Sequence, residues 1–194
     1  MTKSKLGLFG DSFGVVKSIE PFPSWVTLLS KHFDILNYCE SGVGEYKILK
    51  QLQNINLEKF DHIIITHTSA TRVYVKDNLL HSNSEYHKNC DIIYADIEGR
   101  KDEFSKACQN YFKYIFDLDY AIDIHNLICK EINQLVQEKS VTHITHFDYT
   151  KLYHFSNMIN FFNLFEDNRG TVNHYNEYGN YTIYQTLLKN LCLK

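Results

Sequence analysis

The chain has 194 residues, 44% of them hydrophobic and 22% charged, and a formal net charge of -3. One domain of this size buries about 70% of its unfolded surface, so neither a disulfide nor a metal is needed to complete its core. The mixed, slightly acidic charge argues against nucleic acid as a partner. A membrane partner is also not expected, because no apolar run approaches the roughly 20 residues that cross a bilayer.

Apolar runs alternate with helical patterns along the chain, without an internal repeat or a linker rich in proline and glycine. In chain order the patterns predict a strand at 5–10, a helix over 23–33, a strand at 34–39, a helix over 44–55, a strand at 62–67, helices over 102–116 and 119–139, a strand at 141–147 and a last helix over 176–193. This alternation predicts an α/β fold, a three-layer αβα sandwich with a central parallel sheet. We expect one domain over residues 1–194.

Residues 73–99 fit the alternating pattern least well. The segment is polar and contains His81, His87 and Cys90. We interpret it as an insertion over one end of the sheet.

Cysteines and histidines give no sign of a disulfide framework or a metal centre. The five cysteines are an odd, scattered set without a CxxC pair, which predicts reduced and mostly buried thiols. His143 and His146 are three residues apart on a predicted strand, so they should point to opposite faces rather than share a metal. The N-terminal apolar run is too short for a secretory signal. We therefore expect a cytoplasmic protein without a metal or other cofactor.

The stretch KLGLFGDSFGVV, residues 5–16, puts Ser12 directly after the first predicted strand. Ligands bind at the carboxyl ends of parallel strands, and a residue just before a helix also meets the positive end of the helix dipole. Gly10 and Gly14 would give the backbone freedom for a tight exit, and Asp11 could hold the turn through hydrogen bonds. The same residues are common in turns, so this stretch alone also fits an ordinary strand-to-helix connection.

Before the last predicted helix, the tail reads NHYNEYG over residues 173–179. Together with Gly-Asp-Ser after the first strand, this block resembles the SGNH (GDSL-type) hydrolases, a family of esterases and lipases. The resemblance implies a flavodoxin-like SGNH hydrolase fold, with Ser12 as the catalytic nucleophile and His174 as its general base. A serine hydroxyl needs such a positioned base, and histidine is the usual one near neutral pH. Gly42, after the second strand, matches the family's second block.

The third block departs from the family pattern. It typically carries an asparagine that donates to the oxyanion, whereas this chain reads ITHTSATR over residues 65–72. Thr68 stands in the place of the asparagine, and its hydroxyl could complete an oxyanion hole with the amides of Ser12 and Gly42. The alternative interpretation is a polar loop and helix cap. Arg72 could instead bind a carboxylate or phosphate of the substrate.

The last block departs as well, because Thr171 occupies the position of the family's usual aspartate. Asp167 is the first candidate for an orienting acid, and Glu166 and Asp148 are others. A backbone carbonyl could instead hold His174 in a Ser-His dyad. We favour the dyad slightly, because the chain between Asp167 and His174 would have to fold back. Loss of activity is the third alternative.

Aromatic residues near the expected edge of the sheet could hold a substrate. Two roles are open for four tyrosines in this part of the chain: they stack on a sugar ring, or they pack in the core. These residues are Tyr149, Tyr153, Tyr175 and Tyr178. With Asp11 and Arg72, Tyr175 is a candidate for substrate binding. The leading hypothesis is a serine esterase that hydrolyses a small acyl ester, such as an acetyl group, on a small molecule or a carbohydrate. The alternative is a catalytically inactive SGNH-fold protein that binds a carbohydrate or another ligand. The oligomeric state is open.

Overall fold

A five-stranded parallel sheet lies at the centre of the part of the chain that the structure describes. The computed structural model describes residues 3–16, 21–148, 150–170 and 174–192. The strands are β1 (Lys5–Gly10), β2 (Asp34–Asn37), β3 (His62–His67), β4 (Val141–Thr145) and β5 (Met158–Asn160), in the order β2-β1-β3-β4-β5. All neighbouring pairs run parallel, so every strand ends at the same edge of the sheet.

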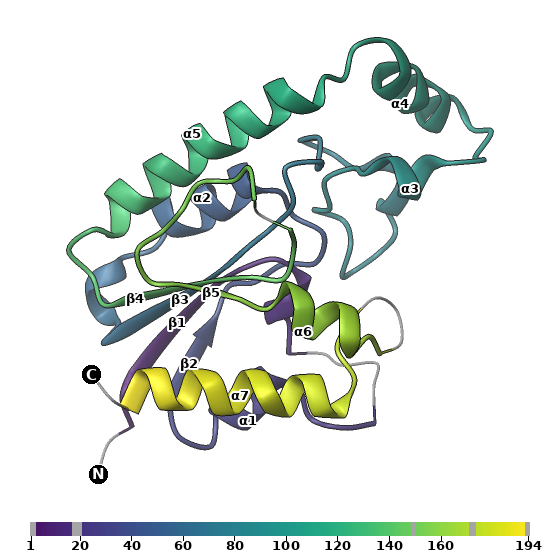
Figure 1. The fold of residues 1–194 in the computed structure, drawn as a ribbon. Helices are drawn as coiled ribbons and strands as arrows, with labels where there is room; N and C mark the ends of the chain where they lie inside the picture. Colours follow the sequence, from purple (N-terminus) through teal and green to yellow (C-terminus); the bar gives the residue numbers. More distant parts are fainter. Residues whose placement is uncertain (1–2, 17–20, 149, 171–173, 193–194) are drawn as a thin grey trace.

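Helices cover both faces of the sheet, which confirms the predicted three-layer α/β sandwich (Figure 1). On one face lie α2 (Glu45–Gln53) and α5 (Leu118–Val136), and on the other lie α1 (Trp25–Leu29), α6 (Phe162–Asp167) and α7 (Glu177–Cys192). Beyond the sheet, near the N-terminal end of α5, lie α3 (Tyr94–Ile97) and α4 (Glu103–Tyr114). Among the described residues, no helix combines the length and the apolarity needed to span a bilayer.

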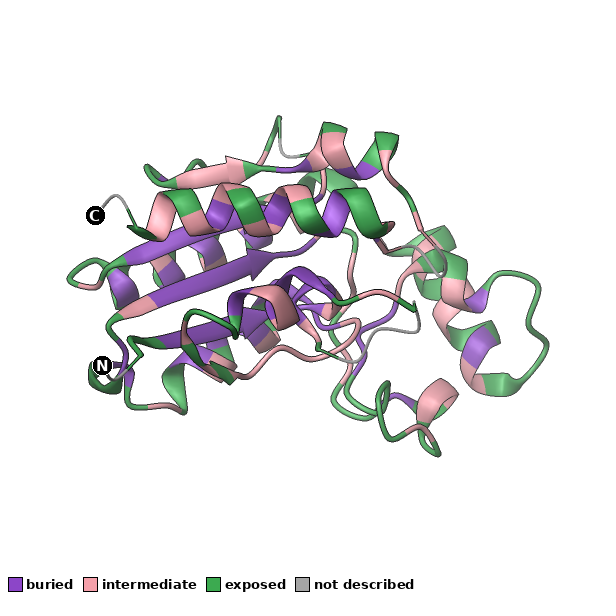
Figure 2. Ribbon diagram, turned by 90° about the horizontal axis from the view of Figure 1, so that it is seen from below, coloured by how far each residue is buried: buried purple, intermediate pink, exposed green. Residues whose placement is uncertain are grey.

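The sheet divides the apolar core in two, because successive residues of a strand face opposite sides. Leu8 of β1 and Ile64 of β3 belong to the cluster against α1 and α7, whereas Phe9 and Ile65 belong to the cluster against α2 and α5. Figure 2 shows the central strands almost wholly buried, while the helices keep an exposed outer side. Burial on both faces explains the uninterrupted β-branched run of β3.

The predicted bounds of β1 and β3 are confirmed residue for residue, but β2 and β4 end two residues earlier than predicted. The side chain of Asn37 accepts a hydrogen bond from the backbone N–H of Cys39 (2.9 Å), and Thr145 Oγ1 accepts one from Phe147 (3.3 Å). These local bonds turn the backbone away from the sheet. The sequence pattern misses β5 and α6, which have three and six residues and are too short for a clear period.

In residues 73–99, all of which the structure describes, no strand of the sheet forms. The segment contains a short 3-10 helix, η3 (Leu79–His81), and α3, and it is tied to α2 by Lys47. Lys47 Nζ donates to the carbonyl oxygens of Val75 (2.9 Å) and Asn89 (2.7 Å) and pairs with the carboxylate of Asp91 (2.7 Å). The segment therefore lies beside the start of α2, at the carboxyl edge of the sheet. A second 3-10 helix, η2 (Leu57–Lys59), precedes β3.

Gly10, at the end of β1, is a position where only glycine fits. Its φ is +139°, and a Cβ there would lie 2.0 Å from Thr66 Oγ1. We expect Gly10→Ala to lower the free energy of unfolding by more than about 3 kcal/mol, measured by urea denaturation, because backbone strain and a steric clash add. The control is Gly99→Ala, at φ +72° with no atom within 4 Å of the added Cβ, for which we expect a cost of about 1 kcal/mol. Equal costs at the two positions would contradict this account.

Candidate active site

Ser12 begins a 3-10 helix, η1 (Ser12–Gly14), directly beyond the carboxyl end of β1. Asp11 caps this turn, because its Oδ1 accepts a hydrogen bond from the backbone N–H of Phe13 (3.1 Å). Thr66 of β3 fixes the same residue twice: its Oγ1 accepts from the backbone N–H of Asp11 (3.0 Å) and donates to Asp11 Oδ1 (3.2 Å). The exit from β1 is therefore held by buried hydrogen bonds, and Ser12 lies half-buried at the edge of the sheet.

The carboxyl group of Asp11 is wholly buried and only partly satisfied. Within the described residues, its Oδ2 has no hydrogen-bond partner. Burial raises the pKa of Asp11 above its ordinary value, and the positive charges of Arg72 and of protonated His174 oppose that rise. Asp11 therefore lies within electrostatic range of two residues that come from distant parts of the sequence.

His174 reaches the site on a chain segment that folds back on itself. Gly170 donates its backbone N–H to the carbonyl oxygen of His174 (2.6 Å), and Arg169 pairs with Tyr175 in an antiparallel bridge. The ring of His174 lies 5.4 Å from the ring of Phe13, which is adjacent to Ser12 in sequence. The structure thus brings the predicted base to the turn that carries the predicted nucleophile.

Asp167 lies at the foot of this fold-back. It is the last residue of α6, it is exposed, and it precedes Gly170, the residue opposite His174, by three residues. A role for Asp167 requires the chain to fold back toward His174, and the chain does so. The residue that pairs with His174 is, however, Gly170 and not Asp167. Thr171, the position of the family's usual aspartate, lies outside the described residues, as does Tyr149.

Arg72 joins Thr68 and Gly42, two of the three residues that were predicted to line the oxyanion hole. Its Nε donates to Thr68 Oγ1 (3.0 Å) and its Nη1 donates to the carbonyl oxygen of Gly42 (3.0 Å). Thr68 is completely buried, whereas Arg72 is half-buried. A guanidinium has five N–H groups, so Arg72 keeps donors beyond these two bonds. Among Arg72, Thr68 and Gly42, it is therefore Arg72 that can present a charged donor at the edge of the sheet.

Tyr175 is buried, which fits the core role that the sequence left open for it. Its hydroxyl lies 2.7 Å from His146 Nδ1 and donates to the carbonyl oxygen of Phe161 (3.3 Å). Burial and the nearby His174 lower the pKa of His146 to about 3. The ring of His146 stacks on Phe13 at 4.3 Å, so a neutral, buried imidazole lies behind the turn of Ser12.

The two other tyrosines of the predicted edge differ in exposure. Tyr153 is half-buried, with its ring 4.9 Å from that of Phe155, and Tyr178 is exposed. Neither the contact of Tyr153 nor the exposure of Tyr178 indicates a sugar in particular.

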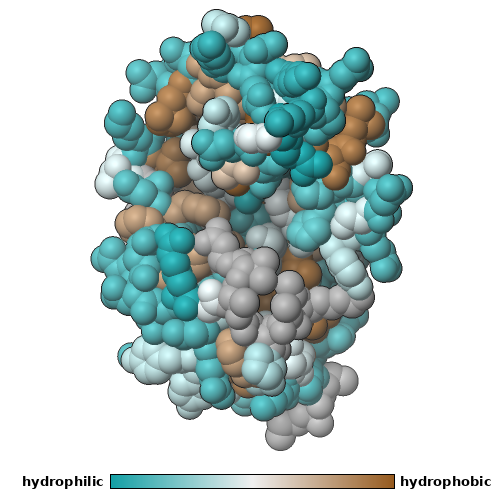
Figure 3. All heavy atoms as spheres, turned by 90° about the vertical axis from the view of Figure 1, so that its right-hand side faces the viewer, coloured by the Kyte–Doolittle hydropathy of each residue, from teal (hydrophilic) through white to brown (hydrophobic). Residues whose placement is uncertain are grey.

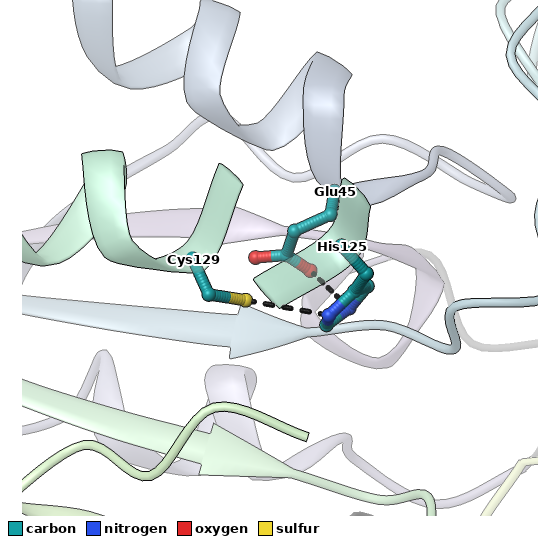
Figure 4. A group of neighbouring side chains, drawn as sticks. All are labelled: Glu45, His125 and Cys129. Carbon is teal, nitrogen blue, oxygen red and sulfur yellow. Dashed lines mark hydrogen bonds and ion pairs between the residues drawn. The ribbon is translucent and has the colours of Figure 1, made fainter. Parts of the chain in front are cut away.

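Glu45, the first residue of α2, holds a buried network that the sequence pattern did not indicate, and Figure 4 shows the part of it formed with His125 and Cys129. Its Oε1 lies 2.6 Å from His67 Nδ1, and its Oε2 accepts from the backbone N–H of Thr68 (3.2 Å) and lies 3.4 Å from His125 Nε2. Burial opposes ionisation, but His67 and His125 outweigh it and hold the pKa of Glu45 well below its ordinary value. His67 continues the chain of bonds to His143 (2.9 Å).

The donor atoms of Glu45, His125 and Cys129 lie close enough together to surround a metal ion. They are, however, bonded within the protein: His125 Nε2 lies 3.0 Å from the carbonyl oxygen of Thr68, and Cys129 Sγ lies 3.5 Å from His125 Nδ1. A metal would have to displace these bonds. The group is therefore best described as a structural network that joins α2, β3 and α5.

Ser12, Arg72 and His174 thus gather at the carboxyl edge of the sheet, and the Glu45 network lies beside them. Comparison of the chain with protein-family models and with curated proteins finds no match.

The pKa of His146 predicts how stability depends on pH. The unfolded state, with a histidine pKa of 6.5, takes up a proton as the pH falls below that value, whereas folded His146, with a pKa of about 3, does not. The native state therefore loses about 2 kcal/mol of stability between pH 7 and pH 5 through this residue. We expect His146→Asn to reduce the pH-dependent loss by that amount, measured by urea unfolding at both pH values. An unchanged pH dependence would rule out His146 as its source.

Proposed function

We propose that the protein is a serine hydrolase that cleaves a carboxylic ester, with Ser12 as nucleophile and His174 as general base. The observation that carries the proposal is the convergence of three distant segments on one edge of the sheet: the turn after β1, the loop after β3 and the fold-back before α7. The resemblance of the first and last sequence blocks to SGNH hydrolases supports the same assignment.

In this mechanism, His174 takes the proton of the Ser12 hydroxyl as Oγ attacks the carbonyl carbon of the ester. The carbonyl π electrons move to its oxygen, which becomes the oxyanion. When the tetrahedral intermediate collapses, the bond to the alcohol breaks and the alcohol leaves with the proton from His174. A water molecule then repeats the sequence on the acyl-enzyme, which releases the carboxylic acid and restores Ser12.

The charges around Ser12 suit this reaction. The Arg72 guanidinium, fixed by Thr68 and Gly42, supplies a positive donor for the oxyanion, assisted by the backbone amides of Ser12 and Gly42. The buried Asp11 carboxylate favours the imidazolium that His174 forms during the attack. Asp11 thus takes the electrostatic part that the family assigns to the missing aspartate, and the backbone of the fold-back orients the imidazole.

The cysteines favour a reducing compartment for this activity. All five are free thiols, and secreted proteins usually pair theirs. The cytoplasm is the compartment we propose.

Active-site labelling separates the hydrolase from a ligand-binding protein that only retains the fold. We expect a fluorophosphonate probe to label the wild type and not Ser12→Ala, and the same change to lower turnover of p-nitrophenyl butyrate by a factor of about 1,000 or more. Ser140→Ala, an exposed serine directly before β4 at the opposite edge of the sheet, is the control and should keep both. Full turnover by folded Ser12→Ala would exclude Ser12 as the nucleophile.

A pair of variants tests whether Arg72 or Thr68 stabilises the oxyanion. Arg72→Lys keeps the charge but loses the two-pronged contact with Thr68 and Gly42, so we expect kcat to fall by a factor of about 100 to 1,000 with little change in KM. Thr68→Val should cost about tenfold, because Thr68 acts by positioning Arg72. A larger loss for Thr68→Val than for Arg72→Lys would show that the threonine hydroxyl is the main donor.

A further inference from the structure

A pocket of about 610 Å³ lies beside the candidate active site and shares Arg72 with it. Its walls come from the start of α2, from residues 69–74 after β3 and from the turn between α4 and α5. Figure 3 looks onto one end of the molecule, where separate groups of apolar residues, in brown, lie on both flanks of a mostly hydrophilic upper half, above a hollow near the middle. Pockets of roughly 300–1,000 Å³ hold drug-sized ligands, so this one is larger than an acetyl group requires.

Apolar side chains make up most of the walls of this pocket. Tyr46 and Tyr74 form one side, where their rings meet edge to face at 5.2 Å. The α4–α5 turn contributes Phe116, and α5 adds Tyr120 and Ile124. Tyr74 is 51% exposed and Tyr120 is 67% exposed, so ring surface remains free to pack against a ligand.

Three titratable groups in the lining, Glu45, Asp91 and His125, are already bound within the protein, whereas Arg72, which keeps further donors, and exposed Asp117 lie at the margin of the apolar wall. Glu45 is occupied by the histidine network described above, Asp91 pairs with Lys47 (2.7 Å), and His125 Nε2 lies 3.0 Å from the carbonyl oxygen of Thr68. Binding the hydroxyl groups of a sugar would require these groups to give up structural bonds, at a free-energy cost for each buried group left unpaired. The part of the pocket between the aromatic rings is therefore suited to an apolar chain, with Arg72 as the charged group at one end.

We propose that this pocket binds the acyl chain of the ester, and that the substrate carries a straight apolar chain of medium length, such as octanoyl. The inference rests on the proposed hydrolase function. Arg72 lines the pocket, and its charge acts on buried Asp11, the residue before Ser12, so a chain in the pocket with its carbonyl end at Arg72 is directed toward that turn. Each methylene group removed from water between the rings strengthens binding.

Chain-length kinetics test the proposal. We compare p-nitrophenyl acetate with p-nitrophenyl octanoate and expect kcat/KM to be larger for octanoate by a factor on the order of 100 or more, from six buried methylene groups. Ala121→Trp, which fills the pocket from α5, should abolish this preference and leave acetate turnover unchanged. Ala107→Trp, the same change at an exposed position of α4, is the control and should keep the preference. A second variant, Ile124→Glu, puts a charge in the wall of the pocket and should also abolish the preference for octanoate.

A binding assay separates this proposal from the proposed function. On Ser12→Ala, octanoate should displace the fluorescent probe 1-anilinonaphthalene-8-sulfonate, and Ala121→Trp or Ile124→Glu should abolish that binding. If Ser12→Ala binds octanoate and the wild type does not hydrolyse either ester, the pocket proposal is supported and the hydrolase proposal is refuted. Turnover that favours acetate, or an octanoate preference that survives both pocket variants, would overturn the pocket proposal and leave the hydrolase standing. Neither binding nor turnover would overturn both.

Discussion

The geometry of the carboxyl edge of the sheet depends on the contacts that the buried carboxylate of Glu45 makes with two histidines and a backbone amide. This carboxylate binds the end of β3 through His67 and the backbone of Thr68, and it binds α5 through His125. Removing one partner of a buried ion pair typically costs about 3–5 kcal/mol, because the remaining charge is left uncompensated. Because Thr68 in turn positions Arg72, the placement of the charged donor near Ser12 follows from a carboxylate that does not touch it.

The segment over 73–99 stabilises the same edge from the other side. Asp91 accepts hydrogen bonds from the backbone N–H groups of Gly44 (2.6 Å) and Val75 (3.1 Å), and its own N–H donates to the carbonyl oxygen of Gly42 (2.9 Å). The loop before α2 is thus held between this segment and Arg72. Donors and dipoles that are fixed before a substrate binds need no reorganisation during a reaction, which is the condition for electrostatic catalysis.

The sequence predicted what depends on local pattern and chain order, and missed what depends on the paths of loops. The continuous apolar run predicted β3, and the strand is found. His143 and His146 do lie on opposite faces of the sheet, as alternation predicts, although His146 is one residue beyond the end of β4. The gathering of Ser12 and His174 at one edge follows from a parallel sheet. The bonds of Arg72 to Thr68 and Gly42 depend on the course of two loops, which no periodicity records. Glu45 was missed because an acidic residue at the start of a helix usually faces solvent.

The strand order has a consequence for how this site can change. The connection from β1 to β2 passes through α1 on one face, whereas those from β2 to β3 and from β3 to β4 pass through α2 and α5 on the other. The chain therefore leaves the adjacent ends of β1 and β3 toward opposite faces, which makes this pair of strands the topological switch point of the sheet. A crevice at that point is produced by the winding of the backbone. Its location would survive replacement of Ser12 or His174, so the chemistry at this edge can diverge while its place in the fold stays the same.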